Sequence, residues 1–290
     1  MVAMANEKRK PFTVRLARER PWIQAIFLTI WLGPFLPRLH NVCSPVFHCY
    51  SCPWAAFACP VGVLANFSAL HVFPFIAIGT VVLVGGVLGS FVCGYACPFG
   101  FLQDLVGKIP TPKFVLPAWA GHVRYVVLIA FALVIPYLYG EGHPLFFCSL
   151  CPAGALEGAV PNAISAAIAG NEVVWPNAVK LVILGAVVVA MFFTQRPWCT
   201  LLCPLGAVYG LFNRASVFFL GYNREECKAC DQCDALCKYG VLPEPGVNAA
   251  RCIRCLDCTR CGAISVGSIL GPAERTKAGT RTGTGTSQDR

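Results

Sequence analysis

The motif Cys-Pro-x-Gly occurs four times in the chain and constrains its fold more than any other feature. The copies begin at Cys59, Cys97, Cys151 and Cys203. Proline disfavours the helical conformation in the residue before it and suits the first position of a new helix, so each cysteine is predicted to be a helix N-cap. Free N–H groups and the helix dipole stabilise a thiolate there, and the glycine leaves room for a bulky inorganic group.

Two of these motifs are preceded by a further cysteine at the same distance. Cys93 stands four residues before Cys97, and Cys199 four residues before Cys203. The two pairs supply four thiolates, which is the number that one 4Fe–4S cluster needs. Buried structural cysteines are the alternative reading, but repetition at matching places favours coordination.

The composition indicates a membrane protein. Of the 290 residues, 56% are apolar and only 13% charged, against roughly 25% charged in soluble domains. Residues 39–103 contain no Asp, Glu, Lys or Arg. The chain contains 18 cysteines, but their spacings are those of metal ligands rather than of a disulfide framework.

Four apolar segments are predicted to span the membrane: residues 21–37, 72–92, 123–139 and 177–194. The order of span, cysteine loop, span and Cys-x-x-x-Cys-Pro occurs twice. We therefore expect an α-helical membrane protein whose residues 21–220 form a duplicated four-helix transmembrane bundle with re-entrant cysteine loops. Uncharged loops at membrane depth need cover from other protein, and repeats place a shared site on their pseudo-symmetry axis. Arg124, at the start of the third span, is expected to snorkel.

The basic residues predict the topology. They cluster in residues 1–20, in the loop around Lys108 and after Arg196, whereas the connections 39–70 and 140–176 have none. The positive-inside rule then places both termini in the cytoplasm of a prokaryotic cell, with a multi-pass inner-membrane protein between them. This distribution also accounts for the net charge of +9 without a nucleic-acid partner.

The same topology places six further cysteines toward the outer face. A second cluster is expected there, held by Cys148 and Cys151 with Cys52 and Cys59 by analogy with the repeat. Cys49 is a close alternative to Cys52, and Cys43 a more distant one. Because the outer face is oxidising, a Cys43–Cys49 disulfide competes with this interpretation, as does a redox dithiol or a copper site.

Residues 221–269 have the cysteine pattern of a bacterial two-cluster ferredoxin. The first run is Cys227, Cys230, Cys233 and Cys237, and the second is Cys252, Cys255, Cys258 and Cys261. In such runs the fourth cysteine serves the other cluster. We therefore expect one cluster on Cys227, Cys230, Cys233 and Cys261, and the other on Cys252, Cys255, Cys258 and Cys237. The last interval of the second run is one residue short. A zinc site is the competing interpretation of these cysteines. Residues 270–290 are predicted to be a disordered tail.

The paired Cys-x-x-x-Cys-Pro motifs at 93–98 and 199–204, followed by this ferredoxin segment, resemble the NapH/NosR/CcoG group of membrane polyferredoxins over about residues 70–265. The resemblance implies clusters on the four cytoplasm-side cysteines and in the ferredoxin segment. It also implies electron transfer, from quinol toward periplasmic reductases in the NapH-like members. The outer-face cysteines and the shortened interval depart from the basic pattern.

We therefore expect an electron conduit across the membrane, from ferredoxin clusters through the inner and outer membrane clusters to a partner oxidoreductase. The catalytic chemistry would belong to that partner, and quinone is a candidate ligand, with Glu141 and Glu157 as proton acceptors. The alternative is an assembly factor that reduces a metal or thiol for a respiratory enzyme, as the resemblance to CcoG permits. His40, His48, His71 and His143 are expected to be packing or hydrogen-bonding groups rather than haem ligands.

Overall fold

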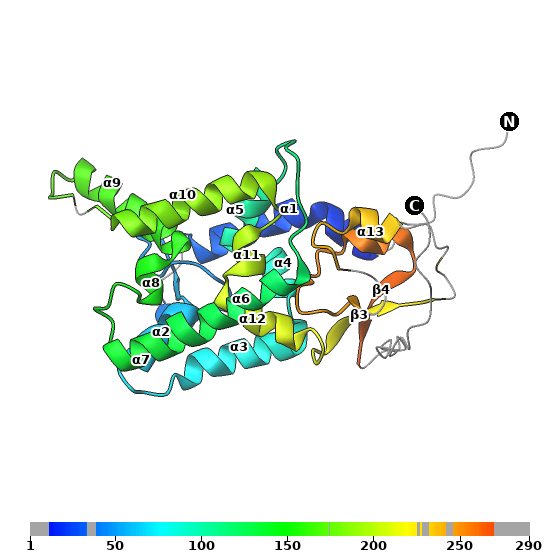
Figure 1. Cartoon of the computed structure of the whole chain (residues 1–290), viewed down its shortest axis with the longest axis horizontal. Helices are drawn as coiled ribbons and strands as arrows, with labels where there is room; N and C mark the ends of the chain where they lie inside the picture. Colours follow the sequence, from blue (N-terminus) through cyan, green and yellow to red (C-terminus); the bar gives the residue numbers. More distant parts are fainter. Residues whose placement is uncertain are drawn as a thin grey trace.

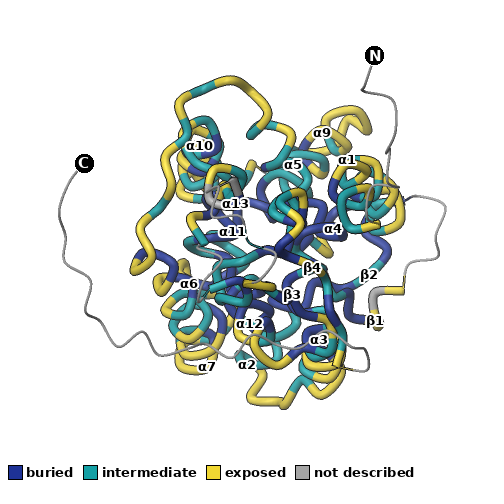
Figure 2. Tube along the Cα trace, turned by 90° about the vertical axis from the view of Figure 1, so that its right-hand side faces the viewer, coloured by how far each residue is buried: buried dark blue, intermediate teal, exposed yellow. Residues whose placement is uncertain are grey.

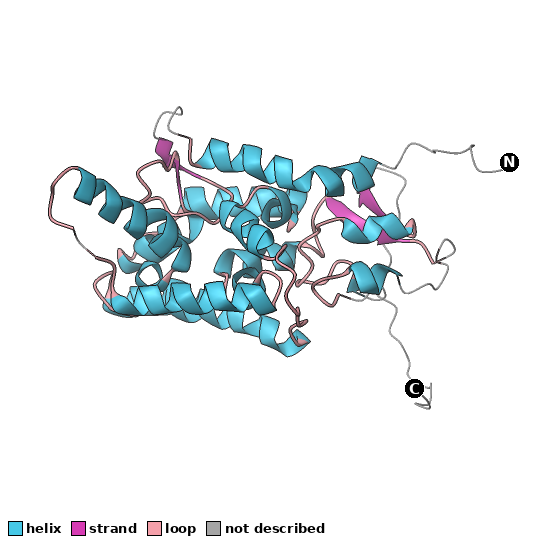
Figure 3. Ribbon diagram, turned by 90° about the horizontal axis from the view of Figure 1, so that it is seen from above, coloured by secondary structure: helices cyan, strands magenta, loops and turns pink. Residues whose placement is uncertain are grey.

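The structure is a computed structural model that describes residues 12–33, 39–173, 175–224, 227, 232–241 and 246–269. The predicted disordered tail at 270–290 and the ligand candidate Cys230 lie outside these residues. The described chain is mostly helical, with two small two-stranded sheets (Figure 3). It forms a helical body and, at one end, a smaller lobe that carries the ferredoxin motifs (Figure 1).

Four long helical segments lie along the long axis of the body (Figure 1). They are α1 (Phe12–Trp31), α3 (Phe75–Leu88), the continuous stretch Ala118–Tyr139 and α10 (Ala178–Phe193). The third comprises η1 (Ala118–His122), α6 (Val123–Val126), η2 (Val127–Val134) and α7 (Ile135–Tyr139).

Only one of these segments has the length and hydropathy of a membrane-crossing helix. Among the described residues that segment is Ala118–Tyr139, with 22 residues and a mean hydropathy of 1.8. The other apolar helices, α2 (Pro60–Ala69), α3 and α10, are shorter. The mostly helical class is therefore confirmed, whereas the four-span bundle stays a prediction.

A residue with positive φ follows each of two apolar helices. Helix α3 stops at Gly89, where φ is 57°, and α10 is followed two residues after its C-cap, Thr194, by Arg196, where φ is 48°. Beyond each break the chain starts a five-residue helix, α4 (Phe91–Tyr95) and α11 (Pro197–Leu201), that carries the first cysteine of a Cys-x-x-x-Cys pair. The backbone is therefore similar around these two cysteine pairs, while the duplicated bundle stays a prediction.

The helical body buries small residues and exposes large apolar ones. Ala77 and Ala132 are fully buried, whereas Phe75, Leu83 and Val182 are each 70% exposed or more. Figure 2 shows this distribution along the chain, with buried segments around α4 and α11 and an exposed rim that includes α7 and α10. Small residues let helix backbones approach closely, as in helix pairs packed within lipid.

Shorter elements complete the body. They are α5 (Pro98–Val106), α8 (Phe147–Leu150), η3 (Gly154–Ala159), α9 (Val160–Ile168) and α12 (Pro204–Phe212). Helix α9 is largely exposed, at the end of the body away from the ferredoxin motifs (Figure 1). Strand β1 (Leu39–Cys43) pairs in parallel with β2 (Phe57–Ala58) and closes the loop between them. Val46 and Phe47 of that loop belong to the main hydrophobic core, so the loop enters the bundle as expected of a covered, charge-free segment.

The smaller lobe is framed by an antiparallel pair of strands, β3 (Phe218–Tyr222) and β4 (Ile264–Ser268). Between them lie α13 (Gln232–Leu236) and η4 (Asp257–Cys261), which pack against each other. The first half of α1 packs on this lobe through Ala17. The guanidinium of Arg254, fully buried, donates hydrogen bonds to the carbonyl oxygens of Leu88 and Asn213 and so ties the lobe to the helical body.

Candidate iron–sulfur sites

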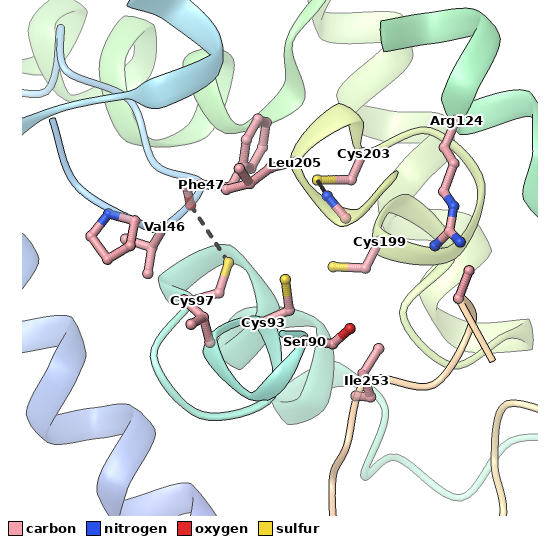
Figure 4. A pocket seen from close by; sticks show the side chains of 14 residues that line it. Val46, Phe47, Ser90, Cys93, Cys97, Arg124, Cys199, Cys203, Leu205 and Ile253 are labelled. Atoms are coloured by element: carbon pink, nitrogen blue, oxygen red, sulfur yellow. Dashed lines mark hydrogen bonds between the residues drawn. The ribbon is translucent and has the colours of Figure 1, made fainter. Parts of the chain in front are cut away.

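The four cysteines of the two Cys-x-x-x-Cys pairs line one cavity in the middle of the body. Cys93 comes from α4, Cys199 from α11, and Cys97 and Cys203 from the starts of α5 and α12. Their side chains surround a common space (Figure 4). The remaining wall is mostly apolar, with Phe47 on one side and the side chain of Arg124 on another. We call this the inner cavity.

The predicted N-cap geometry is confirmed at the inner cavity. Cys97 and Cys203 have extended backbones and precede Pro98 and Pro204, the first residues of α5 and α12. The backbone N–H groups of Gly100 and Gly206 each donate to the sulfur of the capping cysteine, at 3.4 Å. These donors stabilise thiolate, the form that binds metal.

Opposing effects act on the charge of the inner thiols. Burial and the neighbouring Cys199 raise the pKa of Cys97, whereas the Gly100 N–H and Arg196 lower it, with a net value of about 12. Gln103 Nε2 donates to Cys199 Sγ at 3.1 Å and favours the thiolate of that residue.

A buried ionic network holds the helix breaks beside the inner cavity. Arg196 donates to both carboxylate oxygens of Asp104, at 2.7 and 2.6 Å, and to the carbonyl oxygen of Cys93 at 2.6 Å. Arg20 and Gln24 of α1 bond the same carboxylate and the carbonyl oxygen of Gly94. Hydrogen bonds of its own side chain therefore hold Arg196 in its left-handed backbone conformation.

A second set of four cysteines lines a cavity on the side of the body away from the ferredoxin lobe. Its members are Cys49, Cys59, Cys148 and Cys151, and we call the space that they line, of about 210 Å³, the outer cavity. Cys52, which the repeat analogy favoured, is not among the lining residues. A turn in which Cys52 N–H donates to the Cys49 carbonyl oxygen separates the two and puts only Cys49 in the wall.

The outer cavity shares the Cys-Pro-x-Gly geometry but has a more polar wall. Gly154 N–H donates to Cys151 Sγ at 3.4 Å. Lys180 and Asn162 also line the cavity. Glu157 Oε2 accepts a hydrogen bond from Cys49 N–H at 2.8 Å, and burial raises the pKa of Glu157 to about 8.

The competing disulfide is not formed. Cys43 and Cys49 are both free thiols, and Cys43 Sγ bonds the carbonyl oxygen of Ser44 instead. His48 is buried, with ring nitrogens near Ser44 Oγ and the Phe57 carbonyl oxygen, in agreement with a hydrogen-bonding role. Glu141 is exposed.

Two phenylalanine rings connect the cavities. Phe47 lines the inner cavity and Phe147 lines the outer one. Their ring centroids lie 6.3 Å apart in an edge-on arrangement, within the range of favourable aromatic contact. The carbonyl oxygen of Phe47 also accepts from Cys97 Sγ at 3.6 Å (Figure 4).

In the ferredoxin lobe, the second cysteine run lies near the last cysteine of the first run. After burial, the largest effects that raise the pKa of Cys258 are the charges of Cys255, Cys252 and Cys237. This neighbourhood agrees with the crossed ligand set. Cys233 and Cys261 pack in the core of the lobe.

Three functional candidates escaped the sequence reasoning: Arg124, Gln103 and Phe47. Arg124 was expected to snorkel, yet it is buried and lines the inner cavity. A charge inside an apolar span is a functional signal by default and could have identified it. Gln103 and Phe47 carry no such signal, because their contacts depend on chain segments far away in the sequence.

The inner cavity fits a cluster better than a single ion. Among the described residues, no three His, Cys, Asp or Glu side chains converge closely enough to hold one metal ion. The sulfurs instead surround a space, and a Cβ at Gly206 would come within 3.0 Å of the Cys199 carbonyl oxygen beside it. Four thiol donors, N–H groups on their sulfurs and room between them suit a 4Fe–4S cluster.

Comparison with known proteins gives the same chemistry. The model of the 4Fe-4S binding domain family matches residues 70–117, 124–160 and 177–223. An uncharacterized protein of Methanocaldococcus jannaschii is 30% identical over 188 residues, which cover 61% of this chain and 71% of that protein.

Two named relatives match over similar stretches. The regulatory protein NosR of Pseudomonas aeruginosa is 29% identical over 57% of this chain but only 22% of its own length. The ferredoxin-type protein NapH of Escherichia coli is 25% identical over 58% of this chain and 56% of its own length. No solved structure matches the chain significantly.

Proposed function

Because the chain belongs to the NosR- and NapH-like family of 4Fe-4S binding proteins, we propose that it is a membrane-integral electron relay between a cytoplasmic ferredoxin lobe and a partner oxidoreductase on the other face. A 4Fe–4S cluster supplies one-electron transfer when bound. The proposed ligand sets are the four inner cysteines, the four outer cysteines with Cys49 in place of Cys52, and the two crossed ferredoxin sets.

The observation that carries the proposal is that the cysteine sets follow one another through the molecule. The inner cavity is lined by Ile253, which directly follows Cys252 of the ferredoxin lobe. Asn213 Nδ2 donates to the Cys252 carbonyl oxygen at 2.7 Å, and Tyr95 Oη donates to that of Cys255 at 3.1 Å. Residues of the ferredoxin lobe thus complete the wall of the inner cavity.

The contact between the Phe47 and Phe147 rings continues this order to the outer cavity. Both rings belong to the apolar core of the body. A hydrocarbon core of about 30 Å is too wide for one useful electron hop, so electrons would need cofactors at intermediate positions. The inner and outer ligand sets would provide two such positions inside the body.

The exposed apolar surface supports a membrane location. Large apolar side chains face outward on α3, α10 and the helix Ala118–Tyr139, a distribution that water disfavours and lipid accepts. In this arrangement the ferredoxin lobe and the basic N-terminal segment lie in the cytoplasm. The outer cavity then faces the partner, with quinone as a further candidate donor or acceptor.

Iron and acid-labile sulfide analysis of the anaerobically purified protein tests the proposal. We expect about sixteen irons per chain in the wild type, and about four fewer in a Cys148→Ser/Cys151→Ser variant. A Cys43→Ser/Cys52→Ser variant changes the same number of thiols outside the outer cavity and should keep all of the iron.

The opposite result favours an assembly factor. If the wild type and the Cys148→Ser/Cys151→Ser variant both carry about twelve irons, the outer cysteines hold no cluster. Their free thiols in a polar cavity would then suit reduction of a metal or thiol for a respiratory enzyme.

A further inference from the structure

Arg124 is a buried cation without an acidic partner among the described residues. Its side chain is 3% exposed, and Nε is one of three buried side-chain nitrogen or oxygen atoms in the described chain that make no hydrogen bond. Its polar contact is Nη2 to Tyr125 Oη at 3.4 Å, and the guanidinium also lies 5.2 Å from the Tyr125 ring centroid. A buried charge is costly unless it is paired, so this residue requires an anion.

The side chain of Arg124 reaches into the wall of the inner cavity. It extends from α6 toward the space that Cys199 and Cys203 border (Figure 4). The guanidinium therefore faces the space that the proposed ligand set surrounds.

The other buried arginine beside this cavity is different. Arg196 is neutralised by Asp104, which accepts two of its hydrogen bonds. Asp104 therefore offsets part of its charge, although Arg20 shares the same carboxylate. Arg124 contributes a full positive charge, and four thiolates around an iron–sulfur core carry a net negative charge that grows by one on reduction.

We infer that Arg124 is the counter-charge of the cofactor bound by Cys93, Cys97, Cys199 and Cys203 and that it sets the reduction potential of that site. The inference rests on the proposed function, since it needs a cluster in the inner cavity. Arg124 acts through its charge rather than as a ligand. A cation near the site stabilises the more negative, reduced state more than the oxidised one.

The test is a potentiometric titration of the full-length protein followed by electron paramagnetic resonance. The inner-site signal is identified as the one that a Cys203→Ser variant lacks. In Arg124→Gln the equilibrium constant for one-electron reduction of this site should fall at least tenfold, equivalent to a midpoint potential lower by about 59 mV. Arg124→Lys keeps the charge and should stay closer to the wild type.

Two controls make the result decisive. Arg214→Gln removes a charge from an exposed position of the same body, where solvent screens it, and should leave the midpoint potential unchanged. If Arg124→Gln loses the inner iron while Arg124→Lys keeps it, the counter-charge role also stands. An unchanged potential in a fully loaded Arg124→Gln protein overturns the inference, as does equal loss of iron in both Arg124 variants.

The proposed function fails in a distinguishable way. If the Cys203→Ser variant retains the full iron content of the wild type, the inner cavity holds no cluster, and the proposed function falls together with this inference. If Cys203→Ser loses about four irons but the midpoint potential of the inner site is the same in Arg124→Gln as in the wild type, only the inference about Arg124 is wrong.

Discussion

The inner and outer cavities use the same Cys-Pro-x-Gly element but are held by different means. Around the inner cavity both halves of the chain repeat Cys-x-x-x-Cys-Pro after a helix break, and buried bonds from Arg196 to Asp104 and to the Cys93 carbonyl oxygen fix the second break. Around the outer cavity, Cys148 lies three residues before Cys151 and Cys49 ten residues before Cys59. The outer cavity is also the larger of the two.

The Cys-Pro-x-Gly motif alone therefore does not determine how four cysteines are arranged around a cavity. The arrangement is alike in the two halves only where a break between two helices precedes the motif in both of them. The inner site is determined by backbone breaks that are visible in both halves. The outer site depends on loops of unequal length, and its wall includes Lys180 and Asn162. We therefore expect the inner site to be rigid and sensitive to small changes, and the outer site to be more tolerant and open to a partner.

The largest expected effect separates Cys49 from Cys52. Cys49→Ser should remove about four irons per chain, because it deletes one of the four thiols that line the outer cavity. Cys52→Ser should remove none. Iron and sulfide assays on the two variants decide between them, and the reverse pattern would restore the ligand set that the sequence analogy favoured.

The next effect concerns the ionic network beside the inner cavity. Burial tends to raise the pKa of Asp104, but Arg196 and Arg20 more than offset this and lower it. Its contribution is therefore present at neutral pH and is lost as the pH falls through the lowered value. Asp104→Asn breaks a buried pair and should destabilise the protein by about 3–5 kcal/mol.

Thermal unfolding in detergent, followed by size-exclusion chromatography, measures this loss. Glu141→Gln, at an exposed position beyond the network, is the control and should stay within about 0.5 kcal/mol of the wild type. Equal stability of the Asp104→Asn variant would show that the inner cavity does not depend on these bonds.

A smaller effect compares two glycines at corresponding motif positions. A Cβ at Gly206 would lie 3.0 Å from the Cys199 carbonyl oxygen, whereas at Gly62 the nearest atoms would be at 3.6 Å, an ordinary contact. Gly206→Ala should therefore cost about 1–3 kcal/mol, and Gly62→Ala almost nothing. The temperature at which cluster absorbance disappears reports both, and equal sensitivity would contradict a more tolerant outer site.

The smallest effect is expected at Lys180. It lies in the outer wall as Arg124 lies in the inner one, but it is only half-buried, so solvent weakens its charge. Lys180→Gln should shift the midpoint potential of the outer site in the same direction as Arg124→Gln shifts the inner one, and by less. If Lys180→Gln shifted its midpoint potential by more than Arg124→Gln does, the outer site would depend more on a neighbouring charge than the inner site, which contradicts this expectation.

The sequence predicted the elements whose causes are local. Proline after Cys97 and Cys203 places them at helix starts, and the apolar runs predict the helices. The choice of Cys49 over Cys52 depends on a turn, and the partners of Arg124 and Phe47 come from distant segments, so no local pattern revealed them. The predicted segment 72–92 is longer than α3 because the break at Gly89 interrupts an otherwise apolar run, whereas the predicted segment 177–194 agrees with α10 to one residue at each end.

The docking of the ferredoxin lobe has a mechanical consequence. Besides its bonds to Leu88 and Asn213, Arg254 donates to Ser216 Oγ and to the Phe218 carbonyl oxygen. A Cβ at Gly94 would come within 2.7 Å of the Ile253 carbonyl oxygen, so the two chain segments already touch. In the proposed relay, a lobe fastened in this way would stay in one place, so soluble electron carriers would have to come to it.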